Sequence, residues 1–212
     1  MRHVRWFLAI VVVGCSVPQI VRPASDDDTG PDDDTNVEPV TPTPVPVDSG
    51  TTTTDASDAG GGLQVFVTSQ TLTGNMGGLA GGDAMCQLLG ARLGARWAAW
   101  LSVEDGPHAA DRITSAGPWM LPTGELVAAD KASLLSGTLA HAIDRDENGQ
   151  LVSNQNVWTG SGTNGKYSEK DCDRWTTGTN GRLGNTSATG SQWTRAADER
   201  CTNARRLYCF EL

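Results

Sequence analysis

Short apolar runs separated by long polar stretches make up residues 63–212. Residues 63–67 are almost continuously apolar, which is typical of a buried strand. Residues 97–101 form a second run of this kind, and regular structure is next indicated at residues 156–159, around Val157 and Trp158. The final run, 206–212, alternates, so we expect a strand with two distinct faces. One face carries Leu207, Cys209 and Glu211, and the other carries Tyr208, Phe210 and Leu212.

A helix is predicted over residues 83–93. Asp83 is a suitable N-cap, because its carboxylate can accept hydrogen bonds from the first free amide groups of a helix. Met85, Leu88 and Leu89 then follow at helical spacing. Gly94 stands where a helix is expected to stop.

Little regular structure is predicted between residues 160 and 191, which are rich in Gly, Asn, Ser and Thr. One or two helices, short and mostly antiparallel strands, and long loops predict an α+β domain over residues 63–212. The 25 glycines and three phenylalanines of the chain favour a loop-rich domain over a helical bundle. A hydrophobic content of 38% and a mean hydropathy of -0.32 argue against a protein with several membrane spans.

The N-terminus resembles a bacterial lipoprotein signal. Arg2 and Arg5 precede an apolar run at 6–13, which is too short to cross a bilayer as a helix. The sequence VVGC that ends at Cys15 resembles a lipobox, which predicts a signal peptide over 1–14 and lipidation of Cys15. The alternative is an ordinary signal peptide with an incidental cysteine. Ser16 after the cysteine, by resemblance to Gram-negative lipoproteins, favours lipid anchoring at the outer membrane over retention at the inner one, with the domain facing either the periplasm or the cell surface.

Residues 15–62 are predicted to form a disordered acidic tether after the lipidated Cys15. Residues 16–62 contain seven Pro, eight Thr and ten Asp or Glu but no aromatic residue or Leu. Such a segment buries too little apolar area to offset its ordering entropy. It accounts for the formal charge of -9, because the domain beyond it is nearly neutral. Without a basic face, the chain is not expected to bind nucleic acid.

Four cysteines remain in the domain, and an exported chain with an even number of cysteines favours disulfides. They are Cys86, Cys172, Cys201 and Cys209. Four cysteines allow three pairings, and their spacing alone does not choose among them. No spacing typical of a zinc site is present.

Several motifs in the domain resemble the endostatin domain of collagens. They are LTGNMGGLAGGDAMCQLLGARLGARWAAWLS at 72–102, ADR at 110–112, LLSG at 134–137, VWTGSGTNGKYSEKDCDRWTT at 157–177 and CTNARRLYC at 201–209. The same order of motifs marks a bacterial family of endostatin-like outer-membrane lipoproteins. The resemblance covers residues 63–212.

This resemblance implies a C-type-lectin-like fold with paired terminal strands. It also implies two nested disulfides, Cys86–Cys209 and Cys172–Cys201, which would staple the long loops. Lectins of this fold bind sugars through Ca²⁺ with Glu-Pro-Asn or Gln-Pro-Asp, and neither tripeptide occurs here. The resemblance therefore extends to the fold and not to that sugar site.

Residues 144–151 resemble the start of an EF-hand loop, with oxygen ligands at Asp144, Asp146 and Asn148 and a glycine at position 149. Position 12 of such a loop would be Gln155 instead of a glutamate, and no helices are predicted beside it. The sequence allows a weak Ca²⁺ site here, and no other cofactor is expected. The alternative is a hairpin turn, which Asn-Gly favours.

Candidate contacts to a ligand come from tryptophan and arginine. Most of the six domain tryptophans are expected in the core, but Trp175 and Trp193 lie in long loops and are candidates for exposed anchors. Arg205 and Arg206, together with Arg92 and Arg96, are candidates for a basic patch that contacts sulfated glycans, as the resemblance implies for endostatin-type domains.

No signature of a catalytic site is found: the chain has no GxSxG, HExxH or P-loop sequence. We therefore expect a binding protein and no catalysis. The expected function is a lipid-anchored module of the cell envelope that contacts a protein, extracellular matrix or a glycan, as the resemblance implies. The alternatives are a structural envelope lipoprotein without a soluble ligand and a glycan-acting hydrolase with a pair of carboxylates.

Overall fold

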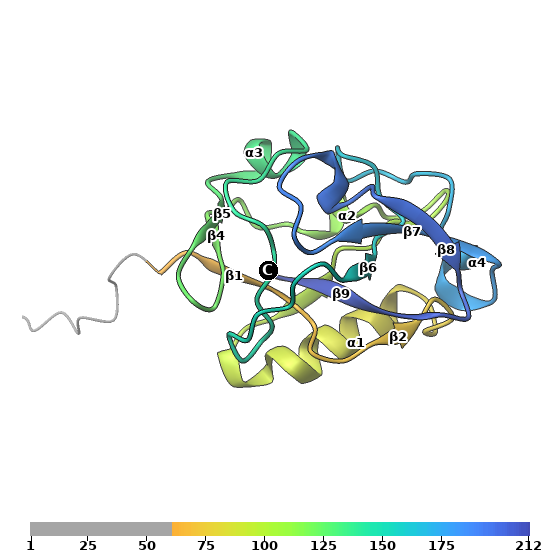
Figure 1. Ribbon diagram of the computed structural model, residues 1–212, viewed down its shortest axis with the longest axis horizontal. Coiled ribbons are helices and arrows are strands. Elements are labelled where there is room, and N and C mark those ends of the chain that lie inside the picture. The colour runs from red at the N-terminus through yellow and green to blue at the C-terminus, as the bar shows by residue number, and fades with distance from the viewer. Residues whose placement is uncertain (1–60) are drawn as a thin grey trace, which may run out of the picture. The chain divides into compact units, whose positions relative to one another are not determined.

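The computed structural model describes residues 61–212, which form an α+β domain (Figure 1). This confirms the predicted α+β class. The signal peptide, the lipidation site Cys15 and the tether up to residue 60 lie outside the described residues. In the part that is described, no helix is both long and apolar enough to cross a membrane.

Nine strands and several short helices make up the domain. The strands are β1 Leu63–Val67, β2 Leu72–Thr73, β3 Trp97–Ala99, β4 Trp119–Met120, β5 Leu126–Ala128, β6 Asn156–Trp158, β7 Asn180–Asn185, β8 Ala197–Arg200 and β9 Ala204–Glu211. The helices are α1 Leu79–Gly90, α2 Ala109–Arg112, α3 Lys131–Leu135 and α4 Cys172–Thr176, with 3₁₀ turns η1 Ala91–Leu93 and η2 Ser191–Trp193.

The sheet is organised around β9, which runs through the middle of the domain in Figure 1. The strand order is β5-β4-β1-β9-β6-β7-β8, and β2 and β3 also pair with β9. Since β1 and β3 both pair with Cys209 and Phe210, they occupy opposite edges of β9. Six of the eight strand pairings are antiparallel, and β1–β4 and β6–β9 are parallel.

The two faces of β9 point into two separate parts of the core, as the alternation in its sequence predicts. Tyr208 and Phe210 pack with Val65, Trp100 and Trp119 in one cluster. Leu207 and Cys209 belong to a second cluster on the opposite side, together with Phe66, Trp97, Trp158 and Trp175. Because both faces are covered, the buried parts of β1 and β9, residues 65–67 and 207–210, carry no charged side chain.

The first helix differs from the prediction at its start. It begins at Leu79, so Asp83 lies inside α1 and is not its N-cap. The extension passes through Gly81 and Gly82, where close packing leaves no room for a side chain: an added Cβ would lie 1.8 Å from the Met76 carbonyl oxygen and 2.7 Å from Leu101, respectively. The predicted stop is confirmed, because Gly94 caps η1 with a φ of 79°.

Within 160–191 the prediction of loop is wrong at β7, whose sequence is NGRLGN. Its register comes from pairing with β6 and β8. Gly184 lets the strand approach Trp193, since an added Cβ would lie 1.9 Å from the Trp193 carbonyl oxygen. Tertiary pairing therefore makes a strand from residues with low strand propensity.

Candidate functional site

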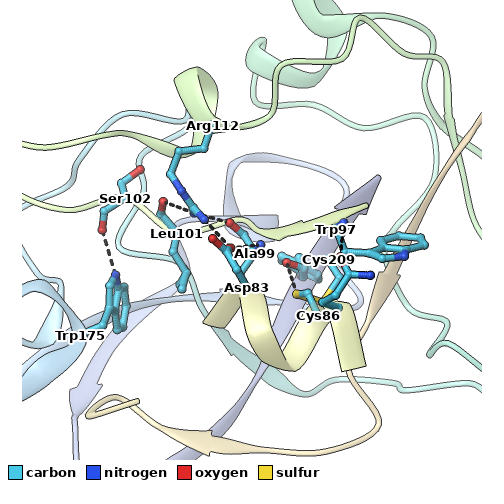
Figure 2. Close-up of polar contacts among 11 residues, drawn as sticks. Asp83, Cys86, Trp97, Ala99, Leu101, Ser102, Arg112, Trp175 and Cys209 are labelled. Carbon is cyan, nitrogen blue, oxygen red and sulfur yellow. Dashed lines mark hydrogen bonds and ion pairs between the residues drawn. A yellow bond between two sulfur atoms is a disulfide. The ribbon is translucent and has the colours of Figure 1, made fainter. Parts of the chain in front are cut away.

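Two disulfides tie the loops and the helix to the sheet. Cys86 on α1 is bonded to Cys209 on β9, with 5.4 Å between their Cα atoms (Figure 2). Cys172 is bonded to Cys201, with 5.7 Å between Cα atoms, and joins α4 to the turn before β9. These are the two pairs that the endostatin resemblance implies. All four cysteines are fully buried.

Trp175 and Trp193 are not exposed anchors, which corrects the sequence prediction. Both side chains are 0% exposed. The indole Nε1 of Trp175 donates a 3.1 Å hydrogen bond to the Ser102 carbonyl (Figure 2), while the Trp193 ring packs 5.0 Å from Trp100 between ring centroids. Their position in long loops misled the prediction, because these loops fold back and supply bulk to both core clusters.

In the predicted basic patch, Arg96 lies apart from Arg205 and Arg206. Arg205 forms hydrogen bonds with Glu199, which lower the pKa of that carboxyl group. Arg206 donates to the Thr68 carbonyl. Arg96 lies beside the other end of β9, where its carbonyl accepts the Leu212 amide. Since β9 separates the two ends by about six residues, Arg96 and Arg205 are about 20 Å apart.

Residues 144–151 form the turn that was the alternative to a Ca²⁺ site. Arg145 and Leu151 form an antiparallel bridge. The Asp146 carboxylate oxygen Oδ1 accepts the amide hydrogens of Asn148 and Gln150, both at 2.9 Å. This carboxylate therefore stabilises its own turn. The structure does not gather Asp144 and Asp146 into a group of three or more acidic, histidine or cysteine side chains around a metal position within residues 61–212.

Asp83 and Arg112 form a clamp that the sequence analysis missed. The Arg112 guanidinium pairs with Asp83 and donates to the carbonyls of Ala99 and Leu101 (Figure 2). Asp83 also accepts the Ala99 amide hydrogen at 2.9 Å. The clamp joins α1, β3 and α2 and so fixes where the chain leaves β3. Both residues belong to motifs that the sequence analysis quoted, Asp83 to DAMC and Arg112 to ADR. The spacing of these motifs along the chain does not show that the two side chains meet.

Ser102 fixes the start of the loop that follows β3. It is fully buried, and its hydroxyl donates to the Gly165 carbonyl at 3.0 Å and accepts the Ala109 amide hydrogen at 2.9 Å. Ser161 Oγ lies 2.8 Å from the same hydroxyl oxygen. The 103–108 loop is thereby held against the segment 161–165.

A left-handed turn occupies α4. Residues 172–175 all have positive φ, between 52° and 63°, although none is a glycine. The Trp175 amide donates to the Asp171 carbonyl at 2.7 Å, which closes the turn. A left-handed helical conformation costs about 1–2 kcal/mol per residue for L-amino acids. The buried Trp175 ring and the Cys172–Cys201 disulfide hold this conformation against that cost. Backbone strain of this kind is enriched at functional sites.

Two open pockets flank the 103–108 loop. One, of about 330 Å³, is lined by Gly78, Leu79, Val103, Pro107, Asp173, Arg174 and Thr176. The other, of about 440 Å³, is lined by Glu104, Asp105, Gly106, His108, Lys166 and Tyr167. We call these two sets together the loop surface. The left-handed turn forms one wall of the first pocket through Asp173 and Arg174, and Thr176, the last residue of α4, adds to the same wall.

Comparison with known proteins gives no family for this chain. No protein-family model matches it, and no curated protein is significantly similar to it.

Proposed function

We propose that this chain is a lipid-anchored binding module of the cell envelope, whose loop surface contacts a protein, matrix or glycan ligand without catalysis. In this proposal Cys15 carries the lipid at the outer membrane, and the acidic segment links it to the domain. Several acyl chains give stable attachment, because each buried CH₂ contributes about 0.8 kcal/mol.

The proposed domain type is endostatin-like within the C-type-lectin-like folds. Support comes from the pairing of β1 with β9, from the α1–β9 disulfide and from the second disulfide in the long loops. All four cysteines of the domain are in these disulfides, so none is available as a nucleophile.

One observation carries the choice of the loop surface. The left-handed turn at 172–175 is conformationally costly. Its two exposed residues, Asp173 and Arg174, line a pocket and do not contribute to the core. A costly exposed backbone conformation held by a buried tryptophan and a disulfide is expected where a surface must keep one shape. A rigid surface loses less entropy when it binds a ligand.

The test is a glycan and matrix-protein array probed with the full oxidised chain, with and without EDTA. The variant Arg174→Glu changes the rim of the first pocket, where the guanidinium lies against Gly106. Arg195→Glu makes the same charge change at an exposed arginine between η2 and β8 and serves as the matched control. We expect Arg174→Glu to weaken binding of the retained ligand at least tenfold and Arg195→Glu to leave it unchanged. Equal effects of both, or no retained ligand, would contradict the proposal.

The anchor needs a separate test. Cys15→Ser should release the chain from the membrane fraction, and a variant that still sediments with membranes would refute lipid anchoring.

A further inference from the structure

The pocket of about 440 Å³ combines an aromatic ring with an excess of carboxylates. Tyr167 is half-buried in its wall, and Glu104 and Asp105 are exposed at its rim. Within residues 61–212 the ion pairs involve neither of these carboxylates. Lys166 is the one lysine of the lining, and it is exposed at the rim.

A buried carboxylate without a cationic partner lies behind this pocket. Asp171 is only 5% exposed, and its Oδ2 accepts the Glu104 amide hydrogen at 2.9 Å. In the described part of the chain no lysine, arginine or histidine lies within ion-pair distance of it. Buried aspartates are rarely left without a counter-charge. Asp171 is not itself part of the pocket lining, but the amide that it accepts belongs to Glu104, so its charge lies next to that lining.

The tyrosine hydroxyl reports the same negative potential. Burial raises the pKa of Tyr167 to about 12, and the charges of Asp171, Glu104, Glu169 and Asp105 add to this shift. Four carboxylates thus act on one aromatic side chain. A cation placed in the pocket would lie closest to Glu104 and Asp105, the two carboxylates of its lining.

We propose that this pocket binds a cationic side chain, the ammonium of lysine or the guanidinium of arginine, on a protein ligand. This inference rests on the proposed function and names the chemistry that one half of the loop surface recognises. An aromatic face beside carboxylates suits an organic cation, because the ring attracts the charge and contacts the attached carbons. A metal ion is disfavoured, since no group of three metal-binding side chains converges in residues 61–212.

Hydrogen bonds hold the pocket wall on both sides. The Tyr167 amide donates to His108 Nδ1 at 3.3 Å, so a neutral His108 carries its hydrogen on Nε2. Ser161 and Tyr167 form a bridge, and the Ser102 hydroxyl fixes the other side of the loop. Binding therefore requires little reorganisation of the backbone, which favours recognition by a preformed site.

The probe for the test is a hexalysine peptide, with hexaglutamine as the neutral peptide, and binding to the full oxidised chain is measured by calorimetry. The double variant Glu104→Gln with Asp105→Asn removes two charges from the rim. The matched control, Glu125→Gln with Asp130→Asn, removes two charges near β5 and α3, and Asn still caps α3. Because the acidic segment 16–62 also attracts hexalysine, only the difference between the two variants counts.

We expect the rim variant to weaken hexalysine binding about five- to tenfold and the control to weaken it less than twofold. Tyr167→Leu should weaken binding about two- to fivefold, whereas Tyr167→Phe, which keeps the ring, should not. Equal losses in the rim and control variants would overturn the proposal. If a ligand from the array depends on Arg174 but not on Glu104 and Asp105, the cation site fails while the proposed function stands.

Discussion

The two disulfides provide the sharpest test of how the domain is stabilised. They close chain segments of very different length, with sequence separations of 123 residues for Cys86–Cys209 and 29 for Cys172–Cys201. To test them, both cysteines of one disulfide are replaced by alanine in one variant of the full chain, and both cysteines of the other disulfide in a second variant.

The expected losses follow from the entropy of the unfolded chain. Closing these loops contributes about 5 kcal/mol for the longer and about 3.5 kcal/mol for the shorter one. For a domain of this size, 1 kcal/mol corresponds to about 2–4 °C in Tm. Loss of Cys86–Cys209 should therefore lower Tm by about 10–20 °C, and loss of Cys172–Cys201 by about 7–14 °C.

The second value is an upper bound. Without its disulfide the turn at 172–175 is free to leave the left-handed conformation, and this relief offsets part of the loss. The assay is differential scanning calorimetry of both variants and of the reduced parent chain. A Tm that moves by less than about 2 °C in the reduced parent would refute this account of stability. A larger drop for the short loop than for the long one would refute its entropic basis.

Four further predictions test individual contacts. Asp83→Ala leaves the Arg112 guanidinium without its counter-charge, although the Arg112 side chain is only 10% exposed. We expect the free energy of unfolding in urea to fall by about 2–3 kcal/mol. A fall below about 0.5 kcal/mol would contradict the clamp. Arg174→Gly should raise stability by about 0.5–1 kcal/mol, since glycine adopts positive φ freely; a lower urea midpoint would argue against the left-handed turn. Gly181→Ala should cost about 1–3 kcal/mol, because the new Cβ would lie 2.7 Å from Cys172 Sγ, whereas Gly190→Ala has nothing within 4 Å and should be neutral by the same measurement. Tyr208→Phe should be neutral or stabilising near neutral pH, since the buried hydroxyl has no hydrogen-bond partner among residues 61–212; burial raises the pKa of Tyr208 well above 10.0, so the parent chain loses stability as pH rises above 10.0, and the variant, which keeps only Tyr167 with a raised pKa, should lose less.

The central strands could be predicted because their sequences carry the pattern of their burial. Alternation in 206–212 correctly assigned Tyr208 and Phe210 to one side of β9 and Leu207 and Cys209 to the other. The run at 63–67 is likewise apolar because both of its faces are covered. Where burial alone decides the structure, hydrophobic pattern is sufficient information.

The loops and the candidate site could not be predicted in the same way. Their geometry depends on contacts between distant residues, such as Ser102 with Gly165 or Asp171 with Glu104. A tryptophan in a polar stretch gives no sign of whether its loop folds inward, and Trp175 shows that it can. Positive φ at four consecutive non-glycine residues has no local signal at all, because it is imposed by Trp175 packing and the disulfide.

The position of β9 in the sheet has a consequence for biosynthesis. This strand follows every other strand in the sequence, yet β1, β2, β3 and β6 all find their hydrogen-bond partners on it. Ribosomes release a chain from its N-terminal end, so the earlier strands must wait without a template until residues 204–211 emerge. This part of the sheet is therefore completed only after β9 has been translated, and until then the open edges of the earlier strands are exposed to wrong pairing and aggregation.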